Sequence, residues 1–135
     1  MKFERFEDIK AWQEARELVK FVYKAIKSNA EFRRDYRLAS QIQAAAVSVM
    51  ANIAEGFARH SNKEFTQFLF ISKSSAAEVQ SHPYVALDQD YIDKEMFDPI
   101  YKSAETVSRM NSNLIKYLRE RSKLKPSCFL TQQTL

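Results

Sequence analysis

Apolar residues recur every three or four positions along most of the chain, which is the spacing expected of amphipathic helices. Residues 8–28 begin this pattern, and their apolar positions fall on one side of a helix: Trp12, Ala15, Val19, Val22 and Ile26. The opposite side is polar: Lys10, Gln13, Glu17, Lys20 and Lys24. The segment therefore predicts a helix that buries a single stripe.

Residues 36–59 predict a second helix, which differs from the first in having two apolar faces. One face is the expected core stripe: Leu38, Ile42, Ala46, Val49, Ile53 and Phe57. The other face is separate from this stripe: Val47, Met50, Ala51, Ala54 and Ala58. A bundle buries one stripe of each helix, so the second face requires another cover.

This second face favours self-association, because Val47 and Met50 are larger than a solvated helix surface needs. Phe70 lies off the inner stripe of the next predicted helix and favours the same interpretation. The alternative is that the alanines are present as good helix formers on a solvated surface. We assign the candidate oligomer interface to Val47, Met50, Ala51, Ala54 and Phe70.

The third predicted helix begins at "SNKE", where Ser61 and Glu64 have the spacing of a capping box. Its inner face then follows the helical period: Phe65, Phe68, Ser72, Ala76 and Val79. Pro83 is expected to kink or end this helix, because proline removes a backbone donor and clashes with the preceding turn.

The fourth predicted helix starts at Asp93, or at Asp98 with Pro99 in its first turn. Its core stripe is Ile100, Val107, Asn111, Leu114 and Leu118. The four segments predict an all-α fold, an antiparallel up-down-up-down four-helix bundle over residues 1–122. Residues 123–135 lose the period and predict a mobile C-terminal tail.

Composition leaves few routes to chemistry. One glycine and three prolines among 135 residues provide almost no phosphate-binding loops or sheet turns. The two histidines and the single cysteine, Cys128, do not make a zinc site of typical spacing, so we expect no metal and no cofactor. A lone cysteine, with no signal peptide and no membrane-spanning run, predicts a cytoplasmic protein with no membrane role.

The polar stripe of the second predicted helix contains Gln41, Ser48, Asn52, Glu55 and Arg59. Glu55 has no histidine or nucleophile at helical spacing, so acid–base catalysis lacks its geometric basis. We instead expect Asn52 and Glu55 to bond to the serines of "SKSSAAE" or to a neighbouring helix. The sequence predicts no catalytic residue, no enzyme activity and no small-molecule substrate.

Gly56 is the only glycine of the chain, and it lies near the core edge of the second predicted helix. A glycine in a helix interior costs roughly 1 kcal/mol relative to alanine. Close approach of a facing helix would offset that cost. We therefore expect Gly56 to form a structural motif with Asn52 and Glu55.

The stretch "LASQIQAAAVSVMANIAEGFARHSNKEFTQFLFISKSSAAE", with "FEDIKAWQEARELV" before it, resembles bacterial four-helix bundle proteins named after reading frames in intervening sequences of 23S ribosomal RNA. The likeness covers about residues 6–120. It implies an antiparallel bundle that assembles into closed rings, commonly pentamers. This family is also similar to the accessory protein of diversity-generating retroelements, which implies association with nucleic acid. Basic residues common in the family after "SQI" are replaced here by Gln43 and Ala44.

Charge is unevenly distributed along the chain. Residues 109–125 carry six basic residues against one acid, whereas residues 78–105 carry seven acids against two lysines. In an up-down-up-down bundle, the end of the fourth helix meets the turn between the second and third. This end gathers the candidate nucleic-acid-binding residues: Arg59, His60, Lys63, Arg119, Arg121, Lys123 and Lys125.

Such cations bind phosphates through counterion release. Alternatively, they complement the helix dipole and keep the protein soluble. The sequence predicts a non-enzymatic, homo-oligomeric helical bundle that acts as an interaction module and binds RNA or DNA through its basic end. The alternative function is a structural assembly or protein-binding scaffold with no nucleic-acid role.

Overall fold

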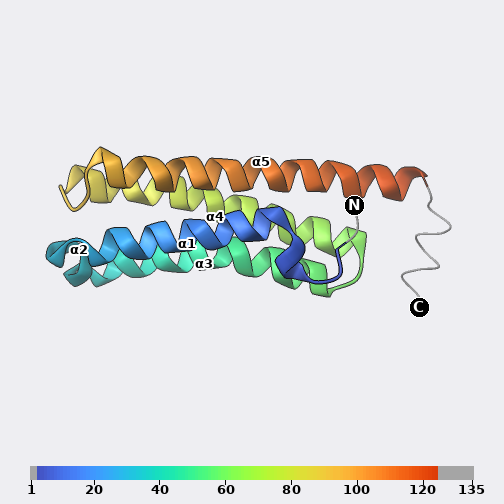
Figure 1. Cartoon of the computed structure of the whole chain (residues 1–135), viewed down its shortest axis with the longest axis horizontal. Helices are drawn as coiled ribbons and strands as arrows, with labels where there is room; N and C mark the ends of the chain where they lie inside the picture. Colours follow the sequence, from blue (N-terminus) through green and yellow to red (C-terminus); the bar gives the residue numbers. More distant parts are fainter. Residues whose placement is uncertain (1–2, 125–135) are drawn as a thin grey trace.

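The computed structural model describes residues 3–124, and within them all regular structure is helical (Figure 1). The elements in chain order are η1 (Phe6–Asp8), α1 (Lys10–Lys27), α2 (Ala30–Arg34), α3 (Tyr36–Ala58), α4 (Asn62–Asp88) and α5 (Lys94–Leu124). Residues 3–124 contain no strand, and the prediction of an all-α fold is confirmed.

The four long helices, α1, α3, α4 and α5, lie side by side along the long axis of the molecule (Figure 1). α1 packs against α3 and α5, and α4 packs against the same two helices. In Figure 1 the turn between α3 and α4 lies toward the end where α5 finishes, and the turn between α4 and α5 lies toward α2. The basic end of α5 is therefore on the same side of the molecule as the α3–α4 turn.

The core is a column of small and medium-sized apolar side chains contributed by all four long helices. These apolar positions have no exposed area: Ala15, Leu18, Val22, Ala46, Val49, Ile53, Leu69, Ala76, Val79, Ala86, Ala104 and Val107. The stripe expected for the last helix is confirmed, because all of its members are buried: Ile100, Val107, Asn111, Leu114 and Leu118. Burial of such side chains is the main stabilising contribution to a fold of this size.

A buried polar chain connects three helices inside this apolar column. The Ser72 hydroxyl of α4 donates to the carbonyl oxygen of Val49 in α3 at 2.7 Å. Asn111 Nδ2 of α5 donates to the same Ser72 oxygen at 2.9 Å, and Asn111 Oδ1 has no hydrogen-bond partner among the described residues. Because buried polar groups are costly when unpaired, these hydrogen bonds favour one register of α3, α4 and α5.

Two helix starts agree with their sequence signals. Ser61 Oγ accepts a hydrogen bond from the Glu64 amide at 3.3 Å, and α4 begins at the next residue, Asn62. Asp93 Oδ1 accepts from the Met96 amide at 3.0 Å, and α5 follows directly. Of the two starts expected for the last helix, Asp93 is therefore the one observed.

Pro83 does not end α4, in contrast to one of the two outcomes expected for it. The helix continues to Asp88, and Pro83 is buried on its inner face. Val79 and Ala86, one turn to either side, have no exposed area. Packing of this face against the bundle offsets the local cost of proline in a helix interior.

The short helix α2 was not predicted, although its start has a sequence signal. Asn29 Oδ1 accepts from the Phe32 amide at 2.8 Å, which caps the helix, and Phe32 is buried.

The last helix, α5, runs to Leu124, two residues beyond the predicted boundary of the bundle. The rest of the predicted tail, residues 125–135, lies outside the described residues.

Tyr91, in the turn between α4 and α5, is bonded to the start of α3. Its hydroxyl donates to Asp35 Oδ2 at 3.0 Å, and its ring stacks on Phe32 with centroids 5.3 Å apart. Asp35 also caps α3 by accepting from the Leu38 amide at 3.2 Å. The hydrogen bond to the Asp35 carboxylate raises the pKa of the Tyr91 phenol above its ordinary value.

Candidate functional site

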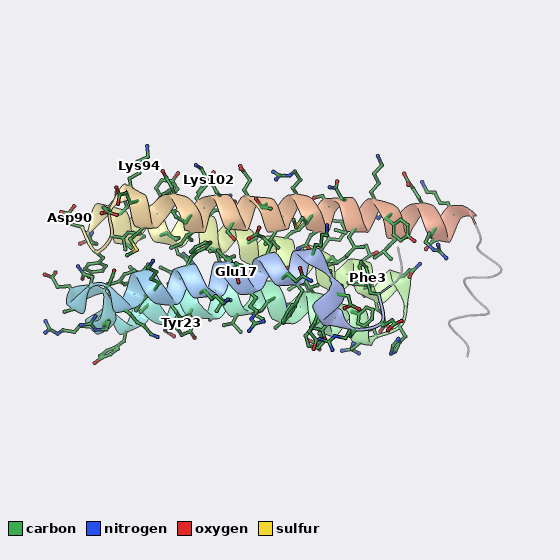
Figure 2. All side chains as sticks on the ribbon, in the orientation of Figure 1. Phe3, Glu17, Tyr23, Asp90, Lys94 and Lys102 are labelled. Atoms are coloured by element: carbon green, nitrogen blue, oxygen red, sulfur yellow. The ribbon has the colours of Figure 1, made fainter. Side chains whose placement is uncertain are left out.

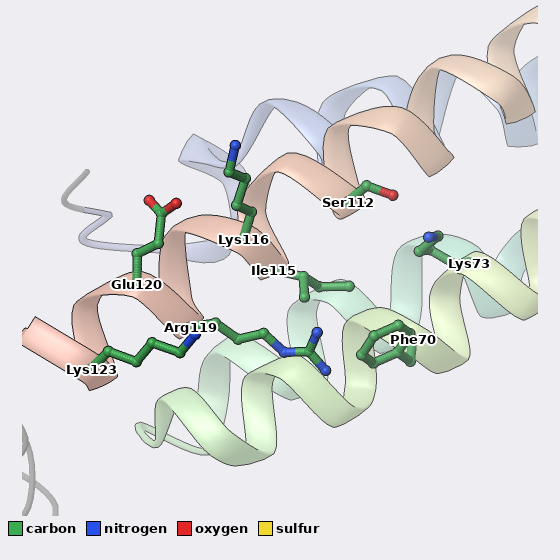
Figure 3. A pocket seen from close by; sticks show the side chains of 8 residues that line it. All are labelled: Phe70, Lys73, Ser112, Ile115, Lys116, Arg119, Glu120 and Lys123. Carbon is green, nitrogen blue, oxygen red and sulfur yellow. The ribbon is translucent and has the colours of Figure 1, made fainter.

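A surface groove runs between α4 and α5 in the half of the bundle where α4 begins and α5 ends (Figure 3). It consists of two adjoining hollows, and both are lined by Phe70, Arg119 and Lys123. The lining residues from α4 include Lys63, Thr66, Phe70 and Lys73. Those from α5 include Ser112, Ile115, Lys116, Arg119, Glu120 and Lys123. We call this surface the α4/α5 groove.

Phe70 is the exposed aromatic side chain of the α4/α5 groove, with 41% of its surface accessible. The Arg119 guanidinium carbon lies 5.2 Å from the centre of its ring, and Lys73 Nζ lies 5.8 Å from the same centre. Figure 3 shows Arg119 reaching from α5 toward this ring on α4. Cations at these distances are attracted to an aromatic ring, so the three side chains form one cluster across two helices.

The groove's cations are not neutralised by carboxylates within residues 3–124. The ion pairs in this part of the chain involve Arg5, Lys20, Arg59 and His82. Glu120 lines the groove but forms none of these pairs. The five basic groove residues therefore give the surface a net positive charge: Lys63, Lys73, Lys116, Arg119 and Lys123.

The hydroxyl groups in the groove donate hydrogen bonds to backbone carbonyls of their own helices. Thr66 Oγ1 donates to the Asn62 carbonyl at 2.8 Å, and Ser112 Oγ donates to the Ser108 carbonyl at 3.1 Å. Ser122 Oγ bonds in the same way to the carbonyl four residues before it, at 3.0 Å. Because these hydroxyl protons are already used, the strongest donors left for an anion are the ammonium and guanidinium groups.

The structure divides the predicted nucleic-acid-binding residues into separate groups. Lys63, Arg119 and Lys123 line the α4/α5 groove together. Arg121 follows Arg119 by two residues, which places it about 200° away around α5. It instead donates from Nη1 to the Tyr117 hydroxyl at 3.2 Å. Arg121 therefore lies on a different side of the helix from the groove.

Arg59 and His60 lie at the end of α3, outside the groove. Arg59 forms an ion pair with Glu55 at 3.3 Å, and its guanidinium carbon is 5.0 Å from the Phe68 ring centre. His60 has a positive φ of 56° in the α3–α4 turn and lines a hollow with Phe3. Lys125, the last predicted member, lies outside the described residues.

The second apolar face of α3 is present on the surface. Val47 is 40% exposed and Ala51 is also exposed, whereas Met50 and Ala54 are half-buried. Phe70 was grouped with these residues but lines the α4/α5 groove instead. Phe70 therefore lines a hollow that the other four residues of the predicted interface do not line, and the interface itself stays a prediction.

The predicted motif of Asn52, Glu55 and Gly56 forms fewer bonds between helices than expected. Asn52 Nδ2 donates to the Ser48 carbonyl at 2.8 Å and to its hydroxyl at 2.9 Å. The Ser48 hydroxyl is in turn 2.8 Å from that of Ser75, so Asn52 reaches the serines of α4 only through Ser48. Glu55 does not bond to those serines, because its carboxylate pairs with an arginine one turn along α3.

Lys73 and Lys116 were missed as site residues by sequence reasoning, although a sequence signal exists. Positions 63, 66, 70 and 73 share one side of a helix, as do positions 112, 116, 119 and 123. Each set is spaced at three or four residues and is rich in lysine or arginine. Reading the two sets as facing stripes would have identified the groove.

Residues 3–124 offer little support for other kinds of site. No three His, Cys, Asp or Glu side chains in that range are gathered as metal ligands. None of the helices described has the combination of length and apolarity that a bilayer crossing needs. The α4/α5 groove is therefore the candidate site with the clearest chemical character.

The fold and the α4/α5 groove define a small helical-bundle protein with a positively charged surface groove. The chain belongs to the family described as 23S rRNA-intervening sequence protein, whose model matches residues 7–113. It is similar to a crystal structure of a protein of unknown function from the S23 ribosomal protein family of Bacteroides thetaiotaomicron VPI-5482. That similarity has 20% identity and a TM-score of 0.72, and covers 78% of this chain and 98% of the other. No curated protein matches the sequence.

Proposed function

We propose that the protein is a non-enzymatic, homo-oligomeric interaction module that binds RNA or DNA through the α4/α5 groove. It acts in the bacterial cytoplasm, and its helices form an antiparallel up-down-up-down bundle. The observation that carries this proposal is that five basic residues, which form no ion pair within residues 3–124, line one groove with the exposed Phe70 ring. A phosphate backbone is a repeating anion that such a row neutralises at several points.

The helix dipole explains only part of this charge. Lys123 lies in the last turn of α5, where a cation is stabilised by the dipole. Lys63 is the second residue of α4, where the dipole disfavours a cation. Lys73 and Lys116 lie well inside their helices. A ligand with negative charge explains all four positions, whereas dipole complementarity explains one.

Family membership supports the proposal only in part. The family description refers to an intervening sequence of 23S rRNA. The match ends at residue 113, so it includes Lys63, Phe70 and Lys73 but not the groove cations of α5, which are Lys116, Arg119 and Lys123. The α5 side of the groove therefore supports the proposal through its own geometry.

Assembly is the second part of the proposal. The second apolar face of α3, on which Val47 and Ala51 are exposed, provides a surface that a second copy would cover. A closed ring, such as the pentamer expected from the family, would repeat the α4/α5 groove once per subunit. Repeated grooves on one ligand would raise the apparent affinity without new contacts. A scaffold that assembles but binds no nucleic acid is the alternative function.

Fluorescence anisotropy with labelled RNA and DNA oligonucleotides tests the proposal. We expect binding at low ionic strength, with little dependence on sequence and a steep loss of affinity as salt rises. A labelled polyglutamate peptide of similar charge is the control for simple polyanion capture, and it should bind more weakly. Absence of any binding to RNA or DNA at low salt would leave the scaffold alternative as the function.

A further inference from the structure

We infer that the ligand strand in the α4/α5 groove is unpaired, with one base stacked on Phe70 and the neighbouring phosphates held by Lys73 and Arg119. This inference rests on the proposed function and specifies the form of nucleic acid that it concerns. The juxtaposition that carries it is the exposed ring of Phe70 with two cations beside it, Lys73 from α4 and Arg119 from α5.

Phe70 has the exposure that a stacking platform needs. The ring is 41% accessible although apolar side chains of this size are usually buried. Ile115 of α5 lines the same hollow and is buried, so this part of the groove has a packed apolar floor. Base stacking on an aromatic side chain tolerates any base, because every base has a π face.

The cations beside Phe70 are suited to a strand whose bases are accessible. The planar guanidinium of Arg119 binds a phosphate bidentately, and it also stacks on aromatic planes. Lys73 contributes a point charge at 5.8 Å from the ring centre, from the same helix as Phe70. Together they place positive charge beside the aromatic ring, as the backbone of a single strand requires around each stacked base.

A duplex would use only half of this surface. In a double helix the π faces of the bases are stacked inside, and the surface presents phosphates and base edges. The cations would then be used while the exposed ring would contact no base face. An unpaired strand uses both, which is why the groove favours it.

A second exposed aromatic residue on α4 has a different environment and provides a control. Tyr84 is 48% exposed, but its ring packs on Phe97 with centroids 4.7 Å apart, and Tyr101 lies 6.4 Å away. No cation lies near its ring among the described residues. It therefore has the exposure of Phe70 without the cations beside it.

The experiment compares a single-stranded oligonucleotide with the duplex of the same sequence, for wild type, Phe70→Leu and Tyr84→Leu. Leucine keeps an apolar side chain at an exposed position, so folding is preserved, and circular dichroism verifies this. We expect Phe70→Leu to weaken single-strand binding by roughly tenfold and duplex binding little. Tyr84→Leu should change neither. 2-Aminopurine in the single strand should lose fluorescence on binding to wild type but not to Phe70→Leu.

The other possible outcomes distinguish the inference of single-strand stacking from the proposed function of nucleic-acid binding. Equal affinity for both ligands, unchanged in Phe70→Leu, overturns the inference while nucleic-acid binding itself stands. Absence of binding by the wild type overturns the proposed function and the inference together. A change in molecular mass of Phe70→Leu by light scattering, with unchanged single-strand affinity, assigns Phe70 to an oligomer interface and also overturns the inference.

Discussion

Gly56 of α3 and Phe68 of α4 approach so closely that a Cβ placed on Gly56 would lie 2.7 Å from Phe68 Cβ. The same atom would lie 3.0 Å from Phe65 Cδ1 and 3.3 Å from the Phe65 carbonyl oxygen. Two of these contacts, with Phe68 Cβ and with the Phe65 carbonyl oxygen, involve atoms on or next to the backbone of α4, which do not move without the helix. The single glycine of the chain therefore lies where α3 and α4 come together before their turn.

Substitution of Gly56 should destabilise the fold despite the better helix propensity of the new residue. Gly56→Ala gains roughly 1 kcal/mol of propensity but overpacks the contact with Phe68, so we expect a net loss of stability. Gly56→Val adds two methyl groups to the Cβ that alanine brings and should cost about 2 kcal/mol or more. Urea unfolding measures both. Ala77→Val, on the exposed side of α4, is the control and should change stability by less than about 0.5 kcal/mol.

The prediction of close packing at Gly56 was possible because a glycine inside a strongly helical run costs stability unless something offsets that cost. The prediction for Pro83 was less accurate, because local rules for proline carry no information about the packing of neighbouring turns. Ser61 was identified as a cap from side-chain chemistry alone, and Asp93 was one of the two starts expected for the last helix. Such signals are local in sequence, and that is why they were read correctly.

Ser72 should be essential to the stability of the core because it satisfies Asn111. Ser72→Ala leaves Asn111 Nδ2 buried without a partner, which should cost about 1–3 kcal/mol in the free energy of unfolding. In an Asn111→Ala background the same change should cost less, because no buried amide is left unpaired. Urea unfolding of the double-mutant cycle measures the coupling. Ser74→Ala, an exposed serine on the same helix, is the control, and equal costs in both backgrounds would contradict the prediction.

Tyr91 should make stability fall at alkaline pH. Its phenol pKa is raised above 10.0 in the folded chain by the hydrogen bond to Asp35, so the folded state holds this proton more tightly than the unfolded state. The contribution is complete below pH 10 and is lost as pH rises through the folded pKa. Tyr91→Phe should lower the melting temperature at neutral pH and reduce the alkaline loss. Tyr36→Phe, at an exposed tyrosine, should leave both unchanged.

Assembly through α3 should be sensitive to charge at its apolar face. Val47→Lys or Met50→Lys places an ammonium group where a second copy would remove water, so the oligomer should dissociate while helicity persists. Light scattering with circular dichroism measures both properties. Val85→Lys adds the same charge at an exposed valine of α4 and should leave the mass unchanged. A monomeric wild type at micromolar concentration would exclude this interface.

The candidate site was harder to predict than the fold, because it depends on which side chains two helices bring together. Lys63, Arg119 and Lys123 were selected for their place at one end of the bundle, and they do share a groove. Arg121 was selected by the same argument but lies on another side of α5. Position along a helix axis follows from chain order, whereas position around it requires knowing which neighbour each face meets.

Groove cations should set the salt dependence of nucleic-acid binding. The triple variant Lys63→Gln, Arg119→Gln and Lys123→Gln removes three candidate phosphate contacts. Binding should therefore weaken similarly for all sequences, and the slope of log affinity against log salt should flatten by roughly 2–3. Both quantities are measured by anisotropy titrations at several salt concentrations.

A charge-matched triple variant separates groove contacts from net charge. Figure 2 shows Lys94 and Lys102 toward the acidic end of α5. The triple variant Lys24→Gln, Lys94→Gln and Lys102→Gln removes three positive charges, the same number as the first variant, all of them outside the groove. This variant should keep most of the wild-type slope, and Arg121→Gln alone should also change it little. If both triple variants flatten the slope equally, binding depends on the overall charge of the protein and the α4/α5 groove is not the binding surface.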